Sequence, residues 1–122
     1  MDLQLNDQQP IFLQVASAIE DAILSGAFKE EEQIPSITDF SVNYKINPAT
    51  ALKGVNLLVN AGIVYKKRGL GMFVAQGATE RLRNLRQEQF YEGFILPMLE
   101  EAARLGLAQE QLRTLIERGL KK

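Results

Sequence analysis

The chain has 122 residues, which suits one domain or a small domain with an appendage. An apolar fraction of 46% and a charged fraction of 24% are typical of a globular protein and argue against a disordered chain. The absence of His and Cys excludes disulfides, Cys or His nucleophiles and zinc sites with nitrogen or sulfur ligands. The sequence has neither a membrane-spanning run nor a signal peptide, and we expect a cytoplasmic protein without a metal or cofactor.

The formal net charge of −1 is the sum of opposed blocks along the chain. Residues 1–39 hold eight acidic residues and one basic residue, whereas residues 40–87 hold eight basic residues and one acidic residue. Residues 88–122 hold six acidic and five basic residues. The basic middle third indicates an anionic partner, but the acidic first third would also neutralise it within the fold. The charge pattern alone leaves both interpretations open.

The first predicted element is a helix over residues 11–25, where apolar side chains recur at spacings of three and four. The acidic run Glu30–Glu32 that follows is interpreted as a solvated loop. A short helix is expected next over residues 37–45. Ser36 suits its N-cap, and Asp39, three residues on, completes a capping box.

A third helix is expected over residues 48–60, because Asn47 can cap it and Pro48 has no N–H to leave unbonded. Two β-rich runs then follow, at residues 63–67 and 72–75, separated by a short connection that contains glycine. This pattern predicts a hairpin. The region therefore combines three helices with one small antiparallel sheet.

The tail is predicted to be helical over residues 79–105 and again over residues 108–120. Pro97 lies inside the first of these segments and is expected to interrupt or kink it, because proline lacks a backbone donor and clashes with the preceding turn. The apolar residues form a broad stripe along both segments.

A short helix, a tight turn, a second helix and a hairpin together make the plan of a winged helix-turn-helix. We predict a mainly α fold with a small β-hairpin, with this domain over residues 1–76 and a two-helix dimerisation tail over residues 77–122. The N-terminus of the helix predicted over residues 48–60 offers free N–H groups and a positive dipole end to a phosphate. Its first exposed positions, Ala49, Thr50 and Lys53, are expected to enter a major groove.

The hairpin connection concentrates Lys66, Lys67 and Arg68 beside Gly69 and Gly71. Glycine allows a backbone to come close to a groove wall, and Arg prefers a narrow minor groove. The alternative is a purely structural role, in which both glycines serve only the turn geometry. For the recognition helix, the corresponding alternatives are that Asn47 is only a cap, that Thr50 bonds its own helix and that Lys53 is simply solvated.

A family resemblance rests on five segments in order: Pro10–Val15, Ala22–Gly26, Ile34–Ile37, Ile46–Ala51 and Gly62–Val74. Together they resemble the N-terminal domain of GntR-type transcription regulators. The short tail resembles that of the YtrA-type subgroup, which has a pair of helices instead of a large ligand domain. The resemblance implies a homodimeric, sequence-specific repressor that binds a palindromic operator in double-stranded DNA.

The resemblance also assigns residues. Asn47 and Thr50 stand where the recognition helix of the family meets DNA, Lys53 takes the place of a usual basic residue, and Arg68 with Gly69 matches the wing tip. The full set of predicted DNA-binding residues is Ser36, Thr38, Asn47, Ala49, Thr50, Lys53, Lys67, Arg68, Gly69 and Gly71.

Some positions depart from the family pattern. Thr38 replaces an Arg that commonly holds DNA, Leu52 stands at a position that is often polar, and Met72 replaces a Thr. The acidic run Glu30–Glu32 replaces a Pro-Gly-Asp loop. These departures bear on affinity and operator sequence and leave the predicted fold intact.

The apolar stripe of the tail is too broad for one short partner helix to cover, so we expect a second copy to complete the burial. The predicted dimer interface consists of Leu85, Tyr91, Phe94, Ile95, Met98, Leu99, Ala102, Leu112, Leu115 and Ile116. Two alternatives remain open. The tail folds back on its own winged domain as a monomer, or it holds an unknown small-molecule effector near Tyr91, Phe94 and Arg104.

The leading hypothesis from the sequence is therefore a DNA-binding transcriptional repressor. The alternative is a winged-helix module that binds protein instead of DNA, which the net acidic charge and Thr38 favour. An enzyme is not expected, because the acidic residues cluster on helix surfaces and turns and no His or Cys is present.

Overall fold

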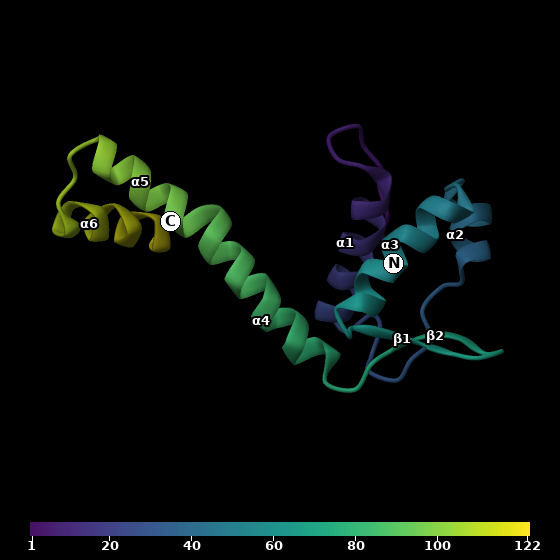
Figure 1. The fold of residues 1–122 in the computed structure, drawn as a ribbon. Coiled ribbons are helices and arrows are strands. Elements are labelled where there is room, and N and C mark those ends of the chain that lie inside the picture. Colours follow the sequence, from purple (N-terminus) through teal and green to yellow (C-terminus); the bar gives the residue numbers. More distant parts are fainter. The chain divides into compact units, whose positions relative to one another are not determined.

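The computed structural model describes residues 1–122. Figure 1 shows its elements, which are α1 (Ile11–Leu24), α2 (Ile37–Tyr44), α3 (Pro48–Asn60), β1 (Val64–Lys67), β2 (Gly71–Val74), α4 (Ala78–Phe90), the π-helix η1 (Tyr91–Ile95), α5 (Leu96–Arg104) and α6 (Gln109–Leu120). The chain divides into an N-terminal unit, Met1–Asn84, and a C-terminal unit, Leu85–Lys122. Helix α4 begins in the first unit and ends in the second.

The N-terminal unit is a winged helix-turn-helix. Helices α1, α2 and α3 pack together, and the β1–β2 hairpin lies at their edge (Figure 1). The core includes Val15, Ile19, Phe40, Val55 and Ile63, none of which exposes any surface. The first four lie on the apolar faces of the predicted helices, so the 3.6-residue periodicity located them, and Ile63 begins the predicted β-rich run.

Helices α1 and α3 approach each other closely at a glycine. A Cβ atom added to Gly54 would lie 2.6 Å from the backbone oxygen of Phe12 and 3.0 Å from the Cβ of Val15. Even the small side chain of alanine would therefore force the two helices apart. The absence of a side chain at Gly54 sets the distance between α1 and α3.

Both predicted N-caps are present. The Asp39 N–H donates to Ser36 Oγ over 3.0 Å and the Ser36 N–H donates to Asp39 Oδ2 over 2.8 Å, which makes the capping box of α2. The Ala49 N–H donates to Asn47 Oδ1 over 2.8 Å at the start of α3, where Pro48 takes the first position. These bonds satisfy helix N–H groups that would otherwise have no partner.

The hairpin carries a third extended segment that the sequence analysis missed. Strands β1 and β2 pair antiparallel, and residues 31–34 pair with the free edge of β2. The Glu31 N–H donates to the Val74 oxygen over 2.8 Å, and the Ile34 N–H donates to the Met72 oxygen over 2.9 Å. The run Glu30–Glu32 is a solvated turn with three exposed side chains, as predicted, but the sequence analysis did not predict that its backbone bonds β2. A run of acids carries no β pattern, so only the partner strand reveals this pairing.

The helix interruption predicted near Pro97 is a π-helical turn between α4 and α5, which is wider than an α-helical turn. Residues Tyr91–Ile95 form a π-helix, in which the Leu96 N–H donates to the Tyr91 oxygen, and α5 starts immediately before Pro97. Proline deletes one helix donor and crowds the carbonyl four residues earlier. A single π-turn relieves that clash by widening the helix at this point.

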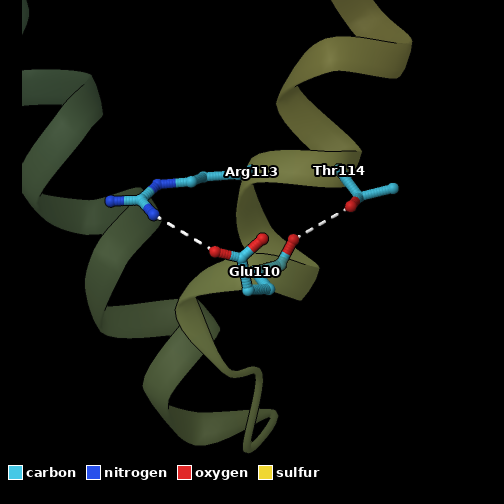
Figure 2. Close-up of polar contacts among 3 residues, drawn as sticks. All are labelled: Glu110, Arg113 and Thr114. Carbon is cyan, nitrogen blue, oxygen red and sulfur yellow. Dashed lines mark hydrogen bonds and ion pairs between the residues drawn. The ribbon is translucent and has the colours of Figure 1, made fainter.

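The C-terminal unit has a polar face and an apolar face. Figure 2 shows part of the polar face of α6, where Glu110 accepts from Arg113 Nη1 over 3.3 Å and its backbone oxygen accepts from Thr114 Oγ1 over 2.9 Å. At the start of α6 the Ala108 N–H donates to Gln111 Oε1 over 2.8 Å. No helix of the chain combines the length and the apolar character that crossing a membrane requires.

Candidate nucleic-acid interface

The outer face of α3 is the first part of the candidate interface. Its inner face buries Ala51, Val55 and Leu58, which leaves the opposite side of the helix in solvent. A shallow groove runs along that outer side, lined by Ala49, Leu52, Lys53, Asn56, Leu57 and Asn60. Two predicted site residues, Ala49 and Lys53, therefore lie in one continuous surface one helical turn apart.

Lys53 is held in place by an aromatic ring. Its Nζ atom lies 4.1 Å from the centroid of the Phe12 ring, within the range of a cation–π interaction. The side chain is exposed, so its charge remains available on the side of α3 that adjoins α1. Lys53 is thus more ordered than a freely solvated lysine.

The wing turn is the second part. Arg68 and Gly69 are exposed, and Lys67 Nζ lies 4.6 Å from the Phe73 ring centroid. The Leu70 N–H donates to the Lys67 oxygen over 2.9 Å and closes the turn. The turn therefore presents cationic side chains on a short, hydrogen-bonded connection.

A contact from the segment that pairs with β2 supports this turn. Gln33 Nε2 donates to the Leu70 oxygen over 2.9 Å. Gly71 has a φ of +124°, and a Cβ atom there would lie 2.5 Å from Gln33 Nε2. The backbone conformation thus favours glycine at this position, and any larger residue would also displace the amide end of the Gln33 side chain. Sequence reasoning did not find Gln33, because its role depends on a hydrogen bond to a residue 37 positions away.

The start of α2 is the third part. Ser36 is half-buried and its hydroxyl oxygen is used as the cap, whereas Thr38 is exposed in the first turn. Asn47 likewise uses its side-chain oxygen as a cap while it remains exposed. Thr50 is half-buried. All ten predicted DNA-binding residues lie in the N-terminal unit, on the start of α2, the start of α3 and the wing.

Acidic side chains lie against this cationic surface. The Tyr65 hydroxyl on β1 donates to Glu31 Oε2 over 2.5 Å, and this bond raises the pKa of Tyr65 above its ordinary value. Glu30 Oε1 accepts from the Gly77 N–H over 2.7 Å, and this bond, with bonds from Thr79, holds the pKa of Glu30 below its ordinary value. Part of the acidic first third is therefore tied to the wing and to the start of α4.

Arg81 makes an internal bond. Its Nη1 atom donates to the backbone oxygen of Gly62, just beyond the C-terminal end of α3. A cation near the C-terminus of a helix is stabilised by the carbonyl groups there. The sequence analysis did not identify this partner.

The predicted dimer residues of the C-terminal unit form two groups. Five of them line an apolar groove of α5 and α6: Met98, Ala102, Leu112, Leu115 and Ile116. The other five, Leu85, Tyr91, Phe94, Ile95 and Leu99, do not line it. Phe94 pairs with Phe90 at a centroid distance of 5.6 Å and is 68% exposed.

No family model matches the chain. It is 30% identical over 114 residues to the uncharacterized HTH-type transcriptional regulator YhcF of Bacillus subtilis (strain 168), covering 92% of this chain and 91% of that protein. A putative transcriptional regulator of the GntR family from Bacteroides thetaiotaomicron has the same fold, with a TM-score of 0.77 and 32% identity over 91% of this chain and 96% of that chain. The AraR DNA-binding domain in complex with operator ORE1 matches at a TM-score of 0.54 and 26% identity, over 62% of this chain and 94% of that chain.

Proposed function

The chain belongs to the GntR family of transcriptional regulators, and on that premise we propose that it is a homodimeric repressor that binds a palindromic operator. Members of this family are regulators with a DNA-binding domain and are not enzymes. The observation that carries the proposal is the surface of the N-terminal unit, where the exposed face of α3 and the cationic wing turn belong to one winged helix-turn-helix.

In this proposal the start of α3 enters the major groove. Ala49 and Lys53 face the base edges, and Lys53 is pre-oriented by the Phe12 ring. Asn47 and Thr50 meet the adjacent backbone. An apolar Ala49 favours contact with a thymine methyl group over a hydrogen bond to a base.

The wing contacts the neighbouring minor groove in the same proposal. Arg68 inserts at the tip, Lys67 neutralises a flanking phosphate, and Gly69 and Gly71 let the backbone approach. At the start of α2, Ser36 and Thr38 contact a backbone phosphate. Thr38 is shorter than an Arg and carries no charge, so this contact is weaker than the one the family pattern provides.

We assign DNA binding to residues 1–76 and dimerisation to residues 77–122. The apolar groove of α5 and α6 supports the second assignment, because a second copy would cover a surface that the single chain leaves in solvent. The relatives of nearly equal length support a YtrA-type protein with a short tail. Two-fold symmetry then places two recognition helices about one DNA turn, roughly 34 Å, apart.

Two further proposals complete the function. We place the protein in the cytoplasm, where operator DNA is accessible. The second is a small-molecule effector as a further ligand of the tail, near Tyr91, Phe94 and Arg104. The Nε atom of Arg104 bonds Glu101 over 2.7 Å, so this carboxylate already neutralises part of the charge that an anionic ligand would meet.

The test is selection of bound duplexes from a random-sequence pool, followed by affinity measurements across salt concentrations. We expect a palindromic motif and a log affinity that falls with log salt by roughly 0.9 per neutralised phosphate. The mass of the complex from light scattering gives two chains per duplex. Recovery of no motif, or binding by a single chain, would contradict the proposal and favour a protein-binding module.

Substitution tests the site. Replacing Lys53 and Arg68 together by Ala removes one groove contact from α3 and one from the wing, so operator affinity falls by about 2–5 kcal/mol. The matched control replaces Arg118 and Lys121, two exposed cations at the end of α6, and has a small effect. Equal losses in the two variants would show that only net charge matters. A promoter fused to the operator then reports repression as higher expression when the protein is absent.

A further inference from the structure

The start of α4 is built into the core of the N-terminal unit. Ala78 and Leu82, one turn apart, are 0% and 1% exposed and belong to the same apolar cluster as Ile63 and Val74. Their burial fixes the first turn of α4 on the winged domain. Helix α4 then continues beyond Asn84 into the C-terminal unit.

Two polar contacts hold the same turn at its two ends. Glu30 accepts from the Gly77 N–H over 2.7 Å at the N-terminus of α4, where a negative charge also complements the helix dipole. Arg81, on the first turn of α4, donates to the Gly62 oxygen just beyond α3. A Cβ atom at Gly62 would lie 3.2 Å from Arg81 Nη1, so the guanidinium lies against this backbone.

These contacts join three elements of different function. Glu30 adjoins the segment that pairs with the wing, and Gly62 directly follows the recognition helix. Arg81 belongs to α4, the helix that leads to the proposed dimerisation tail, and Gly77 directly precedes that helix. The Glu30 carboxylate lies at the N-terminus of α4, and the Arg81 guanidinium lies at the C-terminus of α3. Each charge therefore complements the helix dipole at the end where it lies.

We propose that Glu30 and Arg81 are positioning residues that clamp the first turn of α4 and so set the spacing at which a dimer presents its two α3 helices to the operator. The inference rests on the proposed function, since it needs a dimer that binds two half-sites. A rigid connection raises the effective concentration of the second helix at its half-site, and a loose one lowers it.

The experiment compares duplexes that differ only in half-site arrangement. The probes are the palindrome recovered by selection, one half-site alone, and the palindrome with one base pair inserted at its centre. The variants are Arg81→Ala and Glu30→Ala. Arg83→Ala is the matched control, because it removes the same charge from an exposed position on the same helix.

For Arg81→Ala we expect a loss of about tenfold on the palindrome and less than about twofold on the half-site, relative to Arg83→Ala. The penalty for the inserted base pair shrinks as well, because a loosened α4 tolerates altered spacing. Arg81→Lys keeps the charge and a donor and recovers part of the loss.

Glu30→Ala gives the sharper result, because it removes a negative charge. Electrostatics alone would tighten its binding to every duplex. The clamp instead predicts weaker binding to the palindrome. Equal effects on the palindrome and the half-site, in either variant, would overturn the positioning role and leave a contribution to folding or to overall charge.

A wild-type protein that binds the palindrome no better than the half-site contradicts the proposed dimeric recognition, not the clamp. The clamp is then judged without DNA, by hydrogen exchange of the backbone amides in the first turn of α4. Exchange there becomes faster in Arg81→Ala than in Arg83→Ala if the clamp holds the turn. Unchanged exchange would overturn it.

Discussion

The two units of the chain differ in how much apolar surface they bury. In the N-terminal unit Val15, Ile19, Phe40 and Val55 expose no surface, whereas Ala102 is the one buried apolar residue of the C-terminal unit. The N-terminal unit therefore has a core of its own. The C-terminal unit presents its apolar residues as a groove and as exposed side chains, and an exposed apolar surface of this kind is typical of an interaction site.

The largest expected effect comes from an aromatic residue in the core of the N-terminal unit. Phe40→Ala removes a ring that is 0% exposed, so we expect it to lower the free energy of unfolding by about 3–5 kcal/mol. Phe94→Ala in the C-terminal unit removes a ring that is 68% exposed and costs far less in the single chain. Denaturant titration of both variants measures the difference. Equal costs would show that the C-terminal unit has a core comparable with that of the N-terminal unit.

A charged side chain in the apolar groove of α5 and α6 tests whether this groove is the dimer interface. Leu115→Asp places a carboxylate in the groove of α5 and α6, so we expect the dimer to dissociate with a loss of about 2 kcal/mol or more. Leu120→Asp is the control, because Leu120 is 74% exposed and does not line the groove. Sedimentation at several concentrations gives the dissociation constants. A dimer that tolerates Leu115→Asp would place the interface elsewhere on the tail.

Substitutions at the two wing glycines test how strictly the backbone conformation of the wing is fixed. Gly71→Ala forces a side chain into a φ of +124° and against Gln33, so we expect a cost of about 1–3 kcal/mol and weaker DNA binding. Gly69→Ala meets open space at a φ of +78° and carries only the conformational cost. Thermal melting and operator affinity of the two variants should therefore rank Gly71 above Gly69. The opposite ranking would mean that Gln33 does not support the turn.

The sequence predicted the elements of the N-terminal unit well where the signals are local. The capping residues Ser36 and Asn47 act within three residues, and the apolar periodicity of α1 and α3 is that of the observed core. The roles of Gln33 and Arg81 could not be predicted, because their partners lie 37 and 19 residues away and neither residue belongs to a motif. In the C-terminal unit the periodicity located the apolar stripe. It could not identify a packing partner for that stripe, because the partner depends on a second surface.

The smallest expected effect concerns a contact within the N-terminal unit, where the Glu30 carboxylate accepts from the Gly77 N–H just before α4. This bond lowers the pKa of Glu30 below its ordinary value of 4.5, so the carboxylate stabilises the fold at neutral pH and loses that effect as the pH falls through the lowered pKa. Glu30→Gln should therefore lower the melting temperature slightly at pH 7, and the difference from the wild type should shrink in acid. Glu32→Gln is the control, because the Glu32 side chain is exposed and only its backbone bonds the wing. A pH-independent difference for Glu30→Gln would mean that the charge does not act at the helix start, and the first turn of α4 would then be held by Ala78, Leu82 and the Arg81–Gly62 bond.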